Sequence, residues 1–188
     1  QLHLQLGSFD RAIELLDQSS VNDLPMTSVR EYYTWLSQFG LLDKAEHLLN
    51  STAKNLQRFS SSDQSLYYLM AAQLKAQQNQ TANAEKLFGQ SLEANPTNSD
   101  ALLAFAALAL KQKKYSDAEI LFVRAEATAD AEKRAQLGRA QLYIDTQDYK
   151  AALNQLRSVL QKYPDTQAAK DNIEIIENII RTQEASTP

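Results

Sequence analysis

The sequence predicts an all-α fold built as a stack of repeated helix pairs. The first observation is a period: alanines at positions 84, 118 and 152 stand 34 residues apart, and each is followed four residues later by a large apolar side chain. A fixed period of this length is typical of an array of identical supersecondary units. The second is composition. Only four glycines and four prolines occur, and they fall at junctions between stretches rich in strong helix formers.

The segment 99–132 shows the helix pair most clearly. Its first half has apolar residues at the helical spacing i, i+3, i+4 and i+7, namely Leu102, Phe105, Ala106 and Ala109. After a turn that contains two lysines, a second apolar set follows at Tyr115, Ala118, Phe122 and Ala125. We expect the small Ala118 to lie where the two antiparallel helices come closest, because only a short side chain lets two backbones approach.

Prolines mark the ends of the repeats. Pro96 and Pro164 lie 68 residues apart, which is twice the period, and each follows a second helix that a proline cannot continue. This arrangement resembles the tetratricopeptide repeat, whose motif has a small residue, an aromatic residue, the second-helix alanine and a final proline in these relative places. The resemblance covers about residues 65–166 and implies a right-handed α-α superhelical solenoid. The family's first-helix Trp and Gly are replaced, for example by Gln136 and Ala140, so the copies are degenerate.

The array extends upstream with a changed spacing. Ala45 and Ala12 resemble two further second-helix alanines, and Ala45 precedes Ala84 by 39 residues, five more than the period. We expect the excess residues to lengthen a second helix through Leu56 and Phe59 before Ser60 caps the next helix. The chain begins in what reads as the end of a helix, so we expect it to be a fragment of a larger protein.

The C-terminal segment predicts one more helix. Ala169, Ile173, Ile176 and Ile180 form one apolar stripe, as expected of a capping helix with a solvated outer face. Ile175 and Ile179 leave this stripe, so the alternative is a docking face for a partner or for a second copy of the chain. The complete predicted division is a partial repeat at 1–25, a divergent repeat with an extended second helix at 26–64, repeats at 65–98, 99–132 and 133–166, a capping helix at 167–182 and a tail at 183–188.

Composition and spacing disfavour several functional classes. The net charge is −4 without a long block of one sign, which disfavours nucleic acid and anionic membranes as partners. The longest apolar run, 101–110, is about half as long as a bilayer requires. The chain has no cysteine, and its two histidines, His3 and His47, lie in different repeats without a nearby acidic pair at ligand spacing. We therefore predict no enzyme activity, no cofactor and no metal site.

The resemblance also implies a binding surface. In tetratricopeptide proteins the first helix of each pair faces the concave side, and family members that grip a C-terminal carboxylate use Lys, Asn and Arg there. This chain has leucine or alanine at the matching sites, so an amphipathic helix or an extended segment is a better expected ligand. The leucines could instead only support the inner helix layer. The mapped surface comprises Arg30, Thr34, Gln38, Leu69, Gln73, Gln77, Leu103, Ala107, Lys111, Leu137, Gln141 and Asp145.

The sequence therefore predicts a non-enzymatic scaffold or adaptor that binds a protein or peptide. One alternative is a self-oligomerisation module, with a homodimer formed through the groove or the C-terminal helix. Another is a regulatory or targeting domain of a larger enzyme. The composition, rich in Gln, Asn and Ser, is similar to that of bacterial envelope-assembly repeat proteins. That similarity favours a periplasmic or envelope location and a role in assembling an envelope complex.

Overall fold

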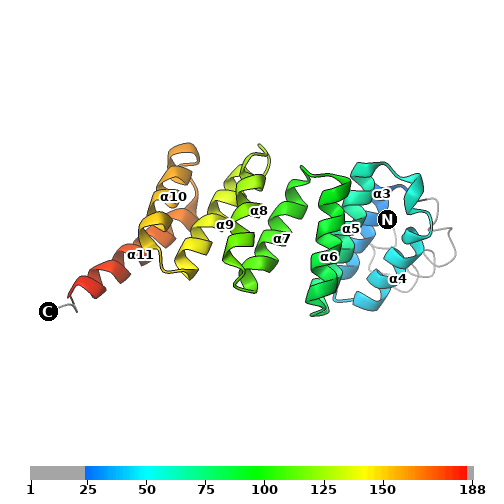
Figure 1. The fold of residues 1–188 in the computed structure, drawn as a ribbon, viewed down its shortest axis with the longest axis horizontal. Helices are drawn as coiled ribbons and strands as arrows, with labels where there is room; N and C mark the ends of the chain where they lie inside the picture. The colour runs from blue at the N-terminus through cyan, green and yellow to red at the C-terminus, as the bar shows by residue number, and fades with distance from the viewer. Residues whose placement is uncertain (1–23, 186–188) are drawn as a thin grey trace. The chain divides into compact units, whose positions relative to one another are not determined.

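The computed structural model describes residues 24–185, which form α-helices and one 3-10 turn and contain no strand (Figure 1). The chain divides into two compact units, residues 1–98 and 99–188. The expected partial repeat at 1–25 lies almost entirely outside the described residues, as do Ala12 and His3.

The described part of the first unit, residues 24–98, consists of two helix pairs. The long helix α5 is its centre, because it packs against α3, α4 and α6. Val29, Leu36 and Leu74 are almost fully buried in the core between these helices. The helices of this unit are α3 (Met26–Gln38), α4 (Leu42–Ala53), α5 (Ser61–Gln77) and α6 (Thr81–Ala94), with the 3-10 helix η2 (Leu56–Arg58) between α4 and α5.

The second unit has two helix pairs and a final helix. Its helices are α7 (Ser99–Lys111), α8 (Tyr115–Glu126), α9 (Glu132–Asp145), α10 (Tyr149–Lys162) and α11 (Gln167–Ala185). Each of α8 to α11 packs against the helix before it. On α11, the side chains of Ala169 and Ile176 are buried in a core shared with α9 and α10.

The periodic alanines lie inside the helix pairs. Ala45, Ala84, Ala118 and Ala152 all have 0% exposure. The apolar side chains that follow four residues later are also buried; they are Leu49, Phe88, Phe122 and Leu156. The alanine lets two helices come close while the larger residue one turn later fills the adjoining space, so the repeat is a packing motif.

The turns inside the helix pairs share a left-handed backbone residue. Gly40, Asn79, Lys113 and Gln147 have φ values of 69°, 59°, 61° and 61°. Each stands five residues before a periodic alanine. A left-handed residue at this place ends the first helix and reverses the chain direction, and glycine adopts that conformation with less strain than a residue with a side chain.

The expected extension of the second helix between Ala45 and Ala84 is wrong. Helix α4 ends at Ala53, and the excess residues form the short helix η2 instead. Asn55 has left the helical conformation at φ −123° and ψ 18°, and asparagine favours turns over helix interiors. The Ser60 hydroxyl then accepts the Asp63 N–H at 3.1 Å, which starts α5.

Candidate partner-binding surface

In the second unit, equivalent positions of the two first helices lie side by side. The guanidinium of Arg134 on α9 donates to Asp100 on α7 at 3.1 and 3.0 Å, and the two residues are one period apart. The helical spacing from Asp100 and Arg134 continues to the mapped residues of each helix. The mapped stripes of α7 and α9 therefore extend along the same face of this unit.

The mapped residues of the second unit are accessible to different degrees. Leu103 and Leu137 are half-buried, so they both support the helices and contribute apolar surface. The other four are exposed: Ala107, Lys111, Gln141 and Asp145. The side-chain amide of Gln141 donates to Asp145 at 2.7 Å. This face thus presents apolar side chains together with a polar pair whose main donor is already engaged.

The mapped residues of the first unit are more polar. Arg30, Thr34 and Gln38 are exposed along α3, and on α5 Gln77 is exposed while Gln73 is half-buried. The Thr34 hydroxyl donates to the Arg30 carbonyl at 2.8 Å, within its own helix.

Leu69 requires a correction to the mapped surface. Its side chain is only 4% exposed, so in this structure it belongs to the packed interior and cannot touch a partner. The reason is the central position of α5, which has neighbouring helices on several sides. The repeat motif specifies contacts within one helix pair, so it does not indicate burial by helices of another pair.

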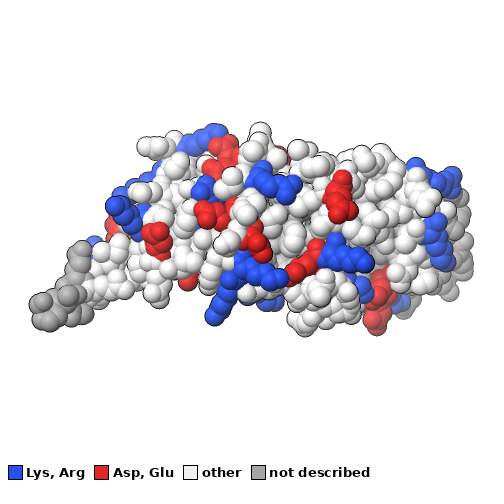
Figure 2. All heavy atoms as spheres, viewed as in Figure 1, with Lys and Arg blue, Asp and Glu red and all other residues white. Residues whose placement is uncertain are grey.

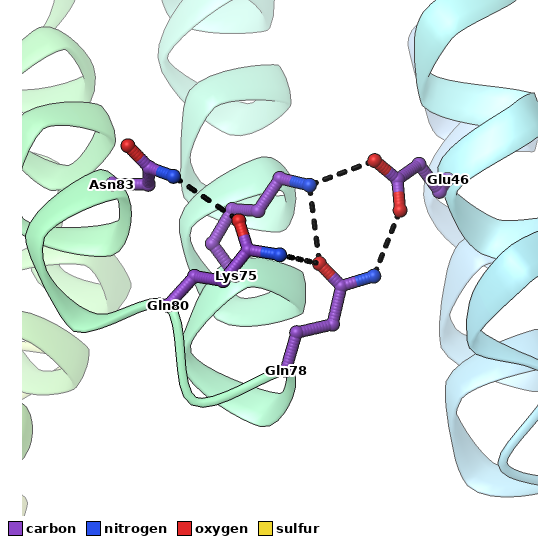
Figure 3. A network of polar contacts seen from close by, with 5 residues as sticks. All are labelled: Glu46, Lys75, Gln78, Gln80 and Asn83. Carbon is purple, nitrogen blue, oxygen red and sulfur yellow. Dashed lines mark hydrogen bonds and ion pairs between the residues drawn. The ribbon is translucent and has the colours of Figure 1, made fainter.

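Other glutamines of the first unit stabilise the fold. Figure 3 shows a polar network in which Glu46 of α4 accepts from Lys75 at 2.7 Å and from Gln78 at 2.8 Å. These hydrogen bonds, with that from Lys75 the strongest, lower the pKa of the Glu46 carboxyl. Gln80 and Asn83 continue the network into α6. It joins the two helix pairs of this unit at their turns.

Charges of both signs are interleaved on the face of the second unit shown in Figure 2. Several are paired inside the unit. Arg139 of α9 contacts Glu126 of α8 at 2.8 Å, and the Tyr143 hydroxyl donates to Glu119 of α8 at 2.7 Å. These contacts hold α9 against α8. Among the described residues visible on this face, there is no broad basic area of the kind that binds nucleic acid.

Among residues 24–185, no group of three or more His, Asp or Glu side chains is placed to hold a metal ion. His47 is exposed on α4. Within the same range, no helix is both long enough and apolar enough to cross a membrane.

Comparison with known families identifies the repeat. Residues 75–142 match the family model described as tetratricopeptide repeat. This segment therefore consists of tetratricopeptide repeats. The resemblance and the all-α solenoid fold class expected from the sequence are therefore confirmed.

Several solved structures share the fold. A tetratricopeptide repeat protein from Parabacteroides merdae has a TM-score of 0.71 at 18% identity, covering 95% of this chain and 69% of that one. A thermophilic tetratricopeptide protein from Thermus thermophilus has a TM-score of 0.62 at 16% identity, covering 92% of both chains. MamA has a TM-score of 0.68 at 14% identity, covering 85% of this chain and 91% of that one. No curated protein matches the sequence significantly.

The tetratricopeptide fold is typical of protein-interaction scaffolds. One contact on these faces was not anticipated from the sequence. The ion pair between Asp100 and Arg134 aligns two first helices, and its sequence signal is a pair of opposite charges one period apart. Such a pair is visible only after the register of the repeats is known.

Proposed function

We propose that this tetratricopeptide chain is a non-enzymatic scaffold that binds a helix or an extended segment of a partner protein on the first-helix face. The observation that carries the proposal is the stripe of the second unit. There Leu103 and Ala107 lie beside Leu137 and Gln141 in a common register, with apolar surface open to solvent. Accessible apolar side chains in such a row are a means of recognising another apolar surface.

The polar groups on this stripe favour a helical partner for the second unit. An extended segment needs donors and acceptors for its backbone, whereas a helix satisfies its own backbone groups. The Gln141 amide donates one N–H to Asp145, so the ammonium of Lys111 is the main side-chain donor left for a bound backbone. An amphipathic helix therefore suits this stripe best. The first unit offers the exposed side-chain donors of Arg30, Gln38 and Gln77, which suit an extended segment.

The test compares two exposed apolar positions of the second unit. Partners captured by the wild-type chain are identified by mass spectrometry, and the affinity for the captured segment is then measured by fluorescence anisotropy. Ala107→Asp is expected to weaken binding by about tenfold or more, because the partner's apolar side chains would desolvate an unpaired carboxylate. Val123→Asp is the matched control, since Val123 is 47% exposed but lies on α8.

Equal affinities of Ala107→Asp, Val123→Asp and the wild type would contradict the proposal. Circular dichroism of each variant shows whether the fold is retained. Both positions are exposed, so we expect unchanged helix content and melting.

We further propose that the partner belongs to a bacterial envelope complex. The support is the similarity of the composition, rich in Gln, Asn and Ser and without cysteine, to that of envelope-assembly repeat proteins. Fractionation of the source cells tests this location. Recovery in the cytoplasm alone would contradict it.

A further inference from the structure

We infer that the outer face of α11 is a self-association surface, on which α11 of a second copy packs in the antiparallel direction. This surface is separate from the stripe proposed to bind a partner on α7 and α9. Five residues define it, namely Glu174, Ile175, Asn178, Ile179 and Arg181, with Asn178 at its centre.

Helix α11 carries apolar surface that its own unit does not cover. Ile176 is buried against α10 at 1% exposure, which identifies the inner side of the helix. Ile175 is 55% exposed, and Ile179 is half-buried. The outer side of this part of the helix is shallow and mainly apolar, and its surface is formed by Ile175, Asn178, Ile179, Arg181 and Thr182.

The helix α11 of a second copy has access to this face. In Figure 1 the C-terminal half of α11, drawn in red, continues beyond α10, and no other described helix of this unit lies beside it. Among the described residues of this unit, no helix therefore covers the outer side of α11 at Ile175 and Ile179.

The outer face of α11 also carries one acidic and one basic side chain. Glu174 and Arg181 are both exposed, and neither side chain takes part in an ion pair within the described part of the chain. They stand seven residues apart, which is two helical turns, and so lie on the same side of α11. The face has an acidic group at one end and a basic group at the other. The same face of a second, antiparallel copy therefore places an opposite charge beside each of them.

Antiparallel packing joins these features in one two-fold arrangement. The midpoint of Glu174 and Arg181 nearly coincides with the midpoint of Ile175 and Ile179, next to Asn178. Reversing a second copy about this midpoint places Glu174 against Arg181 of the second copy and Ile175 against Ile179 of the second copy. Each contact then occurs twice, as a two-fold interface requires. A parallel arrangement would instead oppose like charges.

The expected complex is weak. It consists of two helix turns from each copy, which is less area than stable protein interfaces bury. Sedimentation equilibrium of the wild-type chain over a wide concentration range is therefore expected to show a reversible equilibrium between monomer and dimer. A strictly monomeric chain at the highest concentration would overturn the inference.

Charge reversal identifies the interface. Glu174→Arg alone and Arg181→Glu alone are each expected to weaken dimerisation by roughly tenfold, because two exposed ion pairs become two repulsions. The double variant Glu174→Arg with Arg181→Glu restores both pairs in reverse and is expected to dimerise as the wild type does. Failure of the single variants to weaken the dimer, or of the double variant to restore it, would overturn the proposed pairing.

An apolar substitution with a matched control tests the other contact. Ile175→Asp is expected to abolish the dimer. Ile120→Asp on α8 is the control, since Ile120 is 60% exposed and lies outside the surface. Equal dimerisation of the two variants would overturn the inference. Circular dichroism confirms that each variant is folded, and binding of the partner segment to α7 and α9 is measured separately, because it does not depend on this surface.

Discussion

At the scale of single residues, the size of a side chain decides how closely neighbouring helices of a unit approach. Gly138 of α9 faces the ring of Phe122 of α8, and a Cβ atom built at position 138 would lie 2.2 Å from that ring. Phe122 is 4% exposed, so neighbouring groups surround its ring and restrict its movement. The glycine is therefore required by packing, although glycine is unfavourable inside a helix.

Two glycine-to-alanine substitutions test this requirement. Gly138→Ala is expected to lower the free energy of unfolding by about 1–3 kcal/mol, because the added methyl group overpacks the contact with Phe122. Gly89→Ala in α6 is the matched control, since no atom lies within 4 Å of a Cβ there. It is expected to stabilise the chain by up to about 1 kcal/mol through helix propensity. Urea denaturation measures both, and a stabilised Gly138→Ala would contradict the packing argument.

The sequence predicted some residues better than others for physical reasons. The buried alanines followed from a period that packing imposes on every repeat. The left-handed Lys113 and Gln147 did not, because residues with long side chains rarely adopt this conformation, whereas glycine and asparagine, as at Gly40 and Asn79, favour it. Leu69 was assigned to the surface because its burial depends on several helices at once.

At the scale of elements, the helix pairs follow from local patterns, whereas their connections depend on competing local preferences. Apolar periodicity alone could continue α4 through Leu56 and Phe59. The turn preference of Asn55 and the cap at Ser60 prevail, and the segment forms η2. Leu56 and Phe59 still pack against the core of the first unit, so their apolar character indicated burial correctly but not the conformation.

The network between α4 and α5 predicts a dependence of stability on pH. Glu46 has a lowered pKa in the folded chain because Lys75 and Gln78 donate to its carboxylate. A group whose folded pKa is depressed contributes stability above its unfolded pKa, and this contribution is lost as the pH falls through the folded pKa. The free energy of unfolding of the wild type is therefore expected to decrease as the pH is lowered below about 4.5, the ordinary pKa of glutamate.

The variant Glu46→Gln isolates this contribution. It is expected to be less stable than the wild type at neutral pH, and the difference should shrink as the pH falls below the ordinary glutamate value. Urea denaturation of both proteins across that range measures the difference. A constant difference at every pH would show that the carboxylate charge does not stabilise the contact between α4 and α5.

At the scale of the whole molecule, the repeat period predicted the fold class, whereas the proposed binding side of the first helices came from the resemblance to the tetratricopeptide family. Such a period reports a packing geometry that recurs, so it predicts helix pairs reliably. A partner's identity leaves no comparable period, because partner recognition depends on a few exposed side chains rather than on the packing that repeats. The self-association face on α11 lies outside the repeats. Its charges could be assigned to the outer side of the helix only because the structure shows that Ile176 is buried on the inner side.

The central claim is that the first-helix face of the second unit contacts the partner, and site-specific photocrosslinking tests it most directly. A photoreactive phenylalanine analogue is placed at Ala107 on α7 or, as the control, at Val123 on α8, and the chain is irradiated with its captured partner. Crosslinks from position 107 and none from position 123 are the predicted result. Crosslinks from position 123 alone would contradict the account.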